Sequence, residues 1–274
     1  MKKLASLAVS LVTIVTLLTP LSANASSAVA VEESPTSSVK AYIDYLEKYS
    51  IQDAINSGVT DPTLAAEAQD NSNTILEQFL ALPEEQQQLF VDTLNNQELI
   101  KDIYEGEFDK LGDLKEHVTW TEDSTVIEEP ASRIGTLAVT SREISHDGVL
   151  GLFGLELVKY RVLGKYEYNA YQATNALSSS GYVVQNYNPA VVTSLSSYNG
   201  YVTYGVFYSD VIFSYAIGAG PIPIAQIGNV LMGAKGDQNG KNNTYHCCGI
   251  CGYGNSRSFE LLLSESIVSF CKTF

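Results

Sequence analysis

The residues best suited to chemistry lie near the C-terminal end of the sequence. All four cysteines gather there: Cys247, Cys248, Cys251 and Cys271. Cys248 and Cys251 follow His246 at a spacing found in zinc sites and in thiol–disulfide redox pairs. An even number of cysteines in an oxidising compartment also suits disulfide bonds. We predict disulfides among these residues, with Cys271 joined to the others, and metal binding and redox chemistry remain alternatives.

A bridge between the adjacent residues Cys247 and Cys248 is disfavoured, because neighbouring residues reach disulfide geometry only with strain. The remaining connectivities of the four cysteines stay open.

Candidates for catalysis are few. The sequence has three histidines, His117, His146 and His246. None lies in an H-E-x-x-H pattern, and the sequence has no G-x-S-x-G nucleophile motif. His146 and Asp147 could orient a nucleophile, but Asp147-Gly148 is typical of a turn, which favours a solvated histidine. We therefore predict no catalytic residue, no cofactor and no metal.

The first 25 residues have the three parts of a signal peptide. Met1-Lys2-Lys3 is basic, Leu4 to Leu18 is uncharged and largely apolar, and Ala23-Asn24-Ala25 offers the small residues of a cleavage site. A membrane anchor is the alternative, but the apolar run is shorter than the roughly 20 residues that span a bilayer core. We expect cleavage after Ala25 and a secreted, extracellular protein.

Charge is distributed unevenly over the remaining chain. Residues 26–130 hold 23 acidic and 5 basic side chains, whereas residues 131–274 hold 8 acidic and 9 basic ones. This asymmetry indicates two regions with different roles. It also argues against a nucleic-acid partner, because the acidic half would repel phosphate.

Residues 26–104 have the apolar spacing of helices. One stripe runs from Val39 to Tyr49, and Ser50 with Asp53 indicates a second start that Gly58 ends. Asp61-Pro62 and Leu82-Pro83 are typical of two further helix starts. We predict a small acidic helical bundle; a surface for a partner is the alternative reading of the same stripes.

Residues 105–130 are rich in acids, with glycine and proline and little periodicity. We predict a linker here. A protease-cut boundary between a propeptide and an active domain is the alternative, because exposed linkers attract cleavage.

In residues 131–274 the period changes to two. Leu157 to Tyr168 alternates aromatic and β-branched residues with mostly charged ones, which is typical of a half-buried strand. Turn signals occur at Asn188-Pro189, Asn199-Gly200 and Asn239-Gly240. Six further strands are predicted at 134–144, 182–187, 191–195, 201–215, 222–232 and 259–270. The predicted fold class is α+β, with the helical bundle followed by an antiparallel β-sandwich or barrel.

The tyrosine-rich strands are nearly free of charge. Between Glu167 and Lys235 the only acidic or basic residue, tyrosines aside, is Asp210. Uncharged polar residues alternating with apolar ones suit strands that face water on one side and lipid on the other. Our candidates for membrane contact lie in one glycine- and proline-rich segment: Gly218, Pro221, Ile222, Pro223 and Ile224. An ordinary extracellular sandwich with a Ser/Thr/Asn-rich surface is the alternative.

Two segments carry a family resemblance. Phe79-Leu80-Ala81-Leu82-Pro83-Glu84-Glu85-Gln86-Gln87-Gln88-Leu89-Phe90, continuing through Asn95 to Ile100, resembles a helical segment of exported Bacillus-type proteins. The segment Val184-Gln185-Asn186-Tyr187-Asn188-Pro189 resembles the C-terminal part of the same group, which is similar to the large geobacillin-type bacteriocins. The resemblance implies a secreted antibacterial protein and assigns no catalytic residue.

The function that we expect is that of a secreted antibacterial protein, which acts at the target-cell membrane or envelope without enzymatic chemistry. An immunity protein would then be a further partner. The first alternative is an extracellular binding or matrix module, because Tyr, Ser and Asn supply contact area at low entropic cost. The second is a secreted hydrolase with an acidic propeptide.

Overall fold

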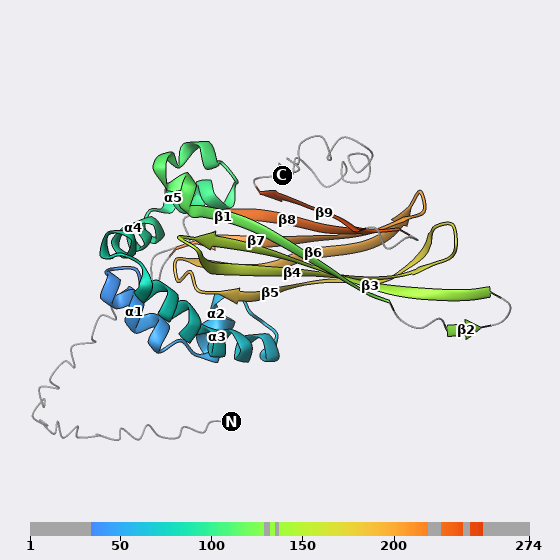
Figure 1. Ribbon diagram of the computed structural model, residues 1–274, viewed down its shortest axis with the longest axis horizontal. Helices are drawn as coiled ribbons and strands as arrows, with labels where there is room; N and C mark the ends of the chain where they lie inside the picture. The colour runs from blue at the N-terminus through green and yellow to red at the C-terminus, as the bar shows by residue number, and fades with distance from the viewer. Residues whose placement is uncertain (1–33, 129–131, 135–136, 219–225, 238–241, 249–274) are drawn as a thin grey trace, which may run out of the picture. The chain divides into compact units, whose positions relative to one another are not determined.

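The computed structural model describes residues 34–128, 132–134, 137–218, 226–237 and 242–248. These residues belong to one compact unit, Glu33–Phe274. In the described residues, helices come first and antiparallel strands follow (Figure 1). The predicted α+β class is confirmed.

The helices begin where local capping chemistry places them. Ser50 and Asp53 form a reciprocal capping box, and the Asp61 side chain accepts hydrogen bonds from the backbone N–H groups of Thr63 and Leu64. Gly58 ends the second helix in the left-handed conformation, with φ of 118°. The helices are α1 Val39–Glu47, α2 Ile51–Ser57, α3 Pro62–Ala81, α4 Glu84–Asn95 and α5 Gln97–Tyr104.

The segment that we predicted as a linker is part of the folded structure. Two short 3-10 helices, η1 Phe108–Lys110 and η2 Gly112–His117, lead into strand β1 Val118–Glu128. β1 pairs along its whole length with β3, so the described residues of this segment, 105–128, belong to the folded unit. The Thr- and acid-rich sequence of β1 suits an edge strand, which faces water on much of its surface.

The strands form two antiparallel sheets. In the first sheet the order is β1-β3-β4-β5, and the short β2 pairs with β3; in the second it is β6-β7-β8-β9. The remaining strands of the first sheet are β2 Ser132–Ile134, β3 Leu137–Leu152, β4 Leu155–Tyr168 and β5 Ala173–Asn186. Those of the second are β6 Val191–Thr203, β7 Val206–Ile217, β8 Gln226–Gly236 and β9 Asn242–Cys248.

Two of the predicted turns lie inside strands. Asn199-Gly200 belongs to β6, and Asp147-Gly148 belongs to β3. Among the described residues, two-residue hairpin turns occur at Phe153-Gly154 between β3 and β4, and at Tyr204-Gly205 between β6 and β7. The predicted strand 201–215 is consequently two strands that meet at Tyr204-Gly205.

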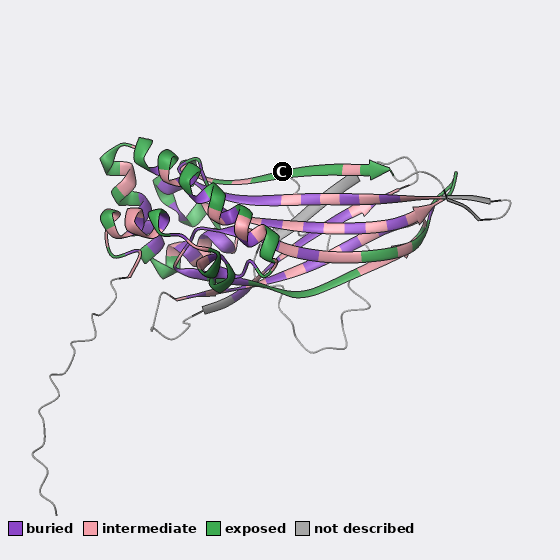
Figure 2. Cartoon of the chain, turned by 90° about the horizontal axis from the view of Figure 1, so that it is seen from below, coloured by how far each residue is buried: buried purple, intermediate pink, exposed green. Residues whose placement is uncertain are grey.

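The two sheets pack face to face. Buried and half-buried residues alternate along the strands, which gives each sheet an inner and an outer face (Figure 2). Tyr166 stacks on Phe207 across the interface, with ring centroids 4.8 Å apart, and Tyr160 lies 4.6 Å from Phe213. Because the described strands divide into two separate sheets, they form a sandwich, not a closed barrel.

The helices are bonded to the sandwich at the end where β5 leads into β6. The hydroxyl of Tyr42 donates to the Tyr187 carbonyl at 3.1 Å, and the hydroxyl of Tyr187 donates to the Ala68 carbonyl at 2.7 Å. The Tyr49 hydroxyl donates to the Asn186 carbonyl at 3.0 Å. Buried residues of the helices and of both sheets belong to one hydrophobic core. The helices and the sheets therefore fold as one body.

Candidate functional site

Few of the sequence-predicted site residues lie in the described part of the chain. Cys247 and Cys248 are the last two residues of β9, where their backbones pair with Leu231 and Val230. Cys251 and Cys271 lie outside the described residues. The disulfides therefore remain a prediction.

Of the membrane-contact candidates, Gly218 follows β7, and its N–H donates to the Ala190 carbonyl at 2.9 Å. This bond fixes the end of β7 beside the start of β6. The other candidates lie outside the described residues: Pro221, Ile222, Pro223 and Ile224.

The β6–β7 hairpin, residues 191–217, contains a single charged residue. Every second residue of β7 is buried against the first sheet, and this inner row is mostly aromatic and aliphatic. The inner row of β7 comprises Phe207, Ser209, Val211, Phe213, Tyr215 and Ile217. The alternation gives β7 an apolar inner face, which is buried, whereas on β6 only Val191 and Thr193 are buried.

The other face of the hairpin mixes polar and aliphatic residues and holds a single charge. In an antiparallel pair, residues that lie opposite each other share a face. The outer row of β7 is Val206, Tyr208, Asp210, Ile212, Ser214 and Ala216, and their partners on β6 include Ser194, Ser197, Asn199 and Tyr201. Asp210 is the only charged residue of the hairpin.

The outer face of the first sheet differs strongly. On β4 the half-exposed positions include Lys159, Arg161 and Lys165, and their partners on β3 include Glu143 and Asp147. Arg161 and Lys159 bind Asp147 at 2.7 and 3.1 Å. This face has the mixed, paired charges of an ordinary water-exposed surface. The low charge of the hairpin is therefore a local property and not a general one of the sandwich.

The single carboxylate of the hairpin lies in a cluster of tyrosines. Tyr201 donates its hydroxyl hydrogen bond to Asp210 at 3.1 Å and stacks on Tyr208, with ring centroids 5.2 Å apart. Lys235 on β8 lies over the Tyr208 ring at 5.4 Å. Burial raises the pKa of Asp210 to about 6, although the hydrogen bond from Tyr201 and the charge of Lys235 act in the opposite direction.

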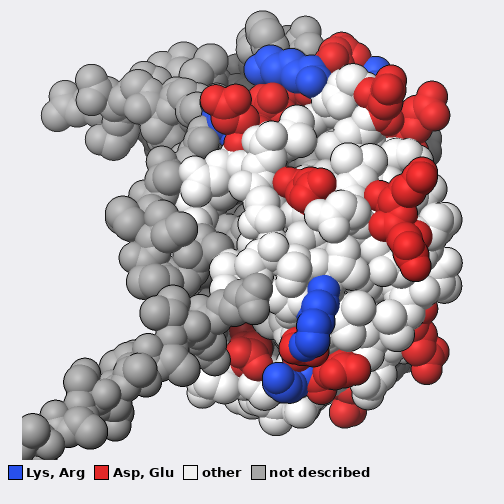
Figure 3. Space-filling model, turned by 90° about the vertical axis from the view of Figure 1, so that its left-hand side faces the viewer, with Lys and Arg blue, Asp and Glu red and all other residues white. Residues whose placement is uncertain are grey.

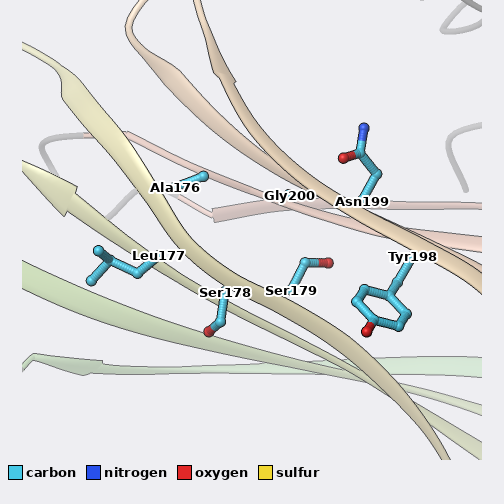
Figure 4. A pocket seen from close by; sticks show the side chains of 7 residues that line it. All are labelled: Ala176, Leu177, Ser178, Ser179, Tyr198, Asn199 and Gly200. Carbon is cyan, nitrogen blue, oxygen red and sulfur yellow. The ribbon is translucent and has the colours of Figure 1, made fainter.

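A shallow hollow of about 180 Å³ lies where β5 and β6 run side by side (Figure 4). Tyr198, which is 58% exposed, and Asn199 line it from β6, and Ser178 and Ser179 line it from β5. Gly200 belongs to this lining, and a Cβ atom there would lie 2.9 Å from the Ser179 Cβ. The hollow offers hydroxyl, amide and aromatic groups but no charge.

A polar row between β1 and β3 has the residue types of a catalytic triad. The Ser124 hydroxyl lies 3.0 Å from His146 Nδ1, and Glu122 lies 3.8 Å from His146 Nε2. The second distance exceeds that of a hydrogen bond. The N–H of Ser124 donates to the Asp123 carboxylate at 2.8 Å, so it is not available to stabilise an oxyanion. The row fits a structural role inside the sandwich, where His146 is fully buried.

The helical end of the molecule is acidic. Seen from that end, carboxylates gather over the surface and few lysines lie among them (Figure 3). The described residues contain no group of three or more His, Cys, Asp and Glu side chains arranged to hold a metal ion. The carboxylates of this surface repel anions.

No family model, no curated protein and no solved structure matches this chain. Among the described residues, no helix is long and apolar enough to cross a membrane.

Proposed function

We propose that this chain is a secreted antibacterial protein that acts at the target-cell envelope, without enzymatic chemistry, by inserting the β6–β7 hairpin into the membrane. Two observations carry the proposal: Asp210 is the only charge in residues 191–217, and buried residues alternate with half-exposed ones along β7. Strands that cross a lipid bilayer have this alternation of apolar and polar positions.

The length of the hairpin supports the proposal. β6 has 13 residues and β7 has 12. A tilted strand crosses the hydrocarbon core of a bilayer with about 9–11 residues. In lipid the backbone groups at both edges of a hairpin must be bonded, so hairpins of several copies would pair with one another.

Insertion requires the hairpin to leave the first sheet, which covers the inner row of β7, and to separate from β8, with which β7 pairs from Phe207 to Ile217. The hydroxyls of Ser179 on β5 and Ser209 on β7 lie 2.8 Å apart across the two sheets. Cysteines at these two positions would place sulfur atoms close enough for a disulfide that holds the sheets together. The double variant Ser179→Cys/Ser209→Cys is therefore a direct test of hairpin release.

We expect the oxidised double variant to fold but to release no dye from liposomes, and we expect a reducing agent to restore release. A matched control joins the two strands of the hairpin to each other: Ser194→Cys/Ser214→Cys, whose residues are paired between β6 and β7. This control should release dye under both conditions. Wild-type protein with and without reducing agent shows the effect of the native cysteines.

Leakage by the oxidised Ser179→Cys/Ser209→Cys variant would contradict release of the hairpin. A wild-type protein that neither releases dye from liposomes nor inhibits bacterial growth would contradict the proposed function itself.

An extracellular binding module is the second candidate, and the hollow between β5 and β6 favours it. Tyr198, Asn199 and Ser178 place an aromatic ring, an amide and a hydroxyl around one depression. Such uncharged groups suit a neutral polar ligand. Loss of binding to cell-wall material in Tyr198→Ala, with liposome leakage absent in the wild type, would support this candidate over the first.

A further inference from the structure

Two hairpin turns of the sandwich share one conformation but differ in their surroundings. Phe153-Gly154 and Tyr204-Gly205 each have two residues with positive φ: 52° and 81° in the first, 49° and 74° in the second. Phe153 is 8% exposed and stacks on His117, with ring centroids 4.3 Å apart. Tyr204 is 98% exposed.

Two-residue turns of this kind favour Asn-Gly, because a bulky side chain is strained at positive φ. Packing in the core offsets that strain for Phe153. Tyr204 gains no such burial, so neither the turn nor the core explains a tyrosine at this position. A strained and fully exposed aromatic residue indicates a role outside the fold.

A second exposed tyrosine lies on the neighbouring loop. Tyr171, in the connection between β4 and β5, is 84% exposed. The Asn169 side chain accepts hydrogen bonds from the N–H groups of Tyr171 and Gln172, which fixes this loop. The N–H of Ala173 donates to the Gly205 carbonyl at 2.8 Å, which ties the two loops together.

Gly205 also permits this close approach, because a Cβ atom there would lie 2.8 Å from the Cβ of Gln172. Tyr171 and Tyr204 are therefore carried on two loops whose backbones are already ordered. Ordering before binding reduces the entropy that binding would otherwise cost.

The two loops lie at the end of the strands opposite the helices (Figure 1). Residues 169–172 and 203–206 contain no charged side chain. Tyrosine is enriched where membranes meet water, because its ring is apolar and its hydroxyl is polar. The rings protrude from turns, which suits entry into a lipid layer better than enclosure of a small ligand, since small ligands bind in concave sites.

We propose that Tyr171 and Tyr204 insert into the interfacial layer of a lipid bilayer and make the first contact of this protein with its target membrane. The proposal rests on the proposed function and specifies which end of the hairpin enters first. This orientation keeps the acidic helices at the far end, away from anionic headgroups.

Replacing Tyr204 tests whether this residue contributes to membrane binding or to the stability of the fold. Tyr204→Asn creates the preferred Asn-Gly turn, so the melting temperature should stay the same or rise. Membrane affinity of interfacial anchors scales with buried apolar area, so binding to phosphatidylcholine/phosphatidylglycerol vesicles should fall, by about tenfold in Tyr171→Ser/Tyr204→Asn. A lower melting temperature with unchanged vesicle binding would overturn the proposal.

A tryptophan reporter locates the contact independently of activity. Trp120 is the only tryptophan of the chain and lies on β1. In a Trp120→Phe background, Tyr204→Trp should shift its emission to shorter wavelength on vesicles and be quenched by brominated lipids. Tyr198→Trp in the same background is the comparison, because Tyr198 is exposed on β6, away from the turn. Position 198 should be quenched only where the whole hairpin inserts, whereas position 204 should be quenched on first contact.

The outcomes separate the two proposals. Vesicle binding with quenching at position 198 and not at 204 would overturn the tyrosine contact and leave membrane action standing. Quenching at position 204 without leakage would support the contact and count against hairpin insertion. Binding of wild type to purified cell-wall glycan, lost in Tyr204→Asn, with no vesicle binding would overturn the lipid contact in favour of a glycan.

Discussion

Asp210 and Asp147 are carboxylates on the outer faces of opposite sheets, and their surroundings move their pKa values in opposite directions. Burial raises the pKa of Asp210 to about 6 from an ordinary value of 3.8. Burial also acts to raise the pKa of Asp147, but hydrogen bonds from Arg161 and Lys159 outweigh it and hold that pKa below its ordinary value. The two residues therefore give opposite dependences of stability on pH.

For Asp210, the folded state holds its proton more tightly than the unfolded state between about pH 4 and pH 6, so its contribution to stability falls as pH rises. Asp210→Asn removes this penalty and keeps an acceptor for Tyr201. We expect the free energy of unfolding of the variant to exceed that of wild type at pH 7. At pH 4 this difference should be smaller, by on the order of 1 kcal/mol. Urea unfolding at both values measures this difference.

Asp147→Asn serves as the control with the opposite sign. Its ion pairs stabilise the folded state above the ordinary carboxyl pKa, and this stabilisation is lost as pH falls through the lowered folded pKa. The variant should therefore be less stable than wild type at pH 7, with the difference shrinking in acid. The same sign in both variants would contradict the opposite pKa shifts of the two carboxylates.

At the scale of elements, the end of α2 and the start of β6 meet at Gly58. Its φ of 118° excludes most side chains, and a Cβ atom there would overlap the Thr193 carbonyl oxygen. Gly58→Ala should therefore force α2 away from β6 and destabilise the protein by about 2 kcal/mol or more. Thermal unfolding followed by circular dichroism measures the loss.

Gly112→Ala is the matched control. Gly112 also has positive φ, 58°, but nothing lies within 4 Å of its Cβ position. This variant carries only the backbone strain, about 1 kcal/mol. Equal losses in the two variants would mean that the contact with Thr193 contributes nothing.

Some helix starts and turns could be predicted from the sequence alone, and others could not. The helix starts at Ser50 and Asp61 were predictable, because capping depends on residues only two or three positions apart. Gly148 and Gly200 looked like turns, but they lie in strands where another residue approaches closely: Met232 and Trp120 at Gly148, and Ser179 at Gly200. Such contacts join residues far apart in sequence, which local patterns do not reveal.

The candidate site was predictable only in part. The low charge of the hairpin and the isolation of Asp210 are visible in the sequence, but the division into a covered and an uncovered face depends on the two-sheet packing. The turn at Tyr204-Gly205 was missed because an aromatic residue is unusual at positive φ, whereas Asn199-Gly200 has the preferred turn sequence. A tyrosine-glycine pair between two alternating runs is the signal that could have located it.

At the scale of the whole molecule, the helices and the sheets share one hydrophobic core. This core predicts what happens when the chain is cut between them, as the propeptide alternative requires. If a protease site is introduced beside Glu107, which is exposed before η1, cleavage should leave the two fragments associated. The tyrosine hydrogen bonds and the common core hold them together. Size-exclusion chromatography should give one native peak, while denaturing electrophoresis gives two bands.

Two separate native peaks after cleavage would contradict this expectation and would favour a removable acidic propeptide. Wild-type protein treated with the same protease is the control for cleavage elsewhere in the chain.

The hydrogen bonds from Tyr42, Tyr49 and Tyr187 also have a mechanical consequence, because they attach the helices at one end of the strands only. A force that separates the two sheets at the Tyr204 end acts through a lever arm of roughly 40 Å, one strand length at about 3.3 Å per residue. It would break the interface row by row, whereas a force at the helical end must break many contacts at once. We therefore expect the sheets to separate more readily from the Tyr204 end, where the hydrogen bond from the Ala173 N–H to the Gly205 carbonyl must break first, than from the helical end.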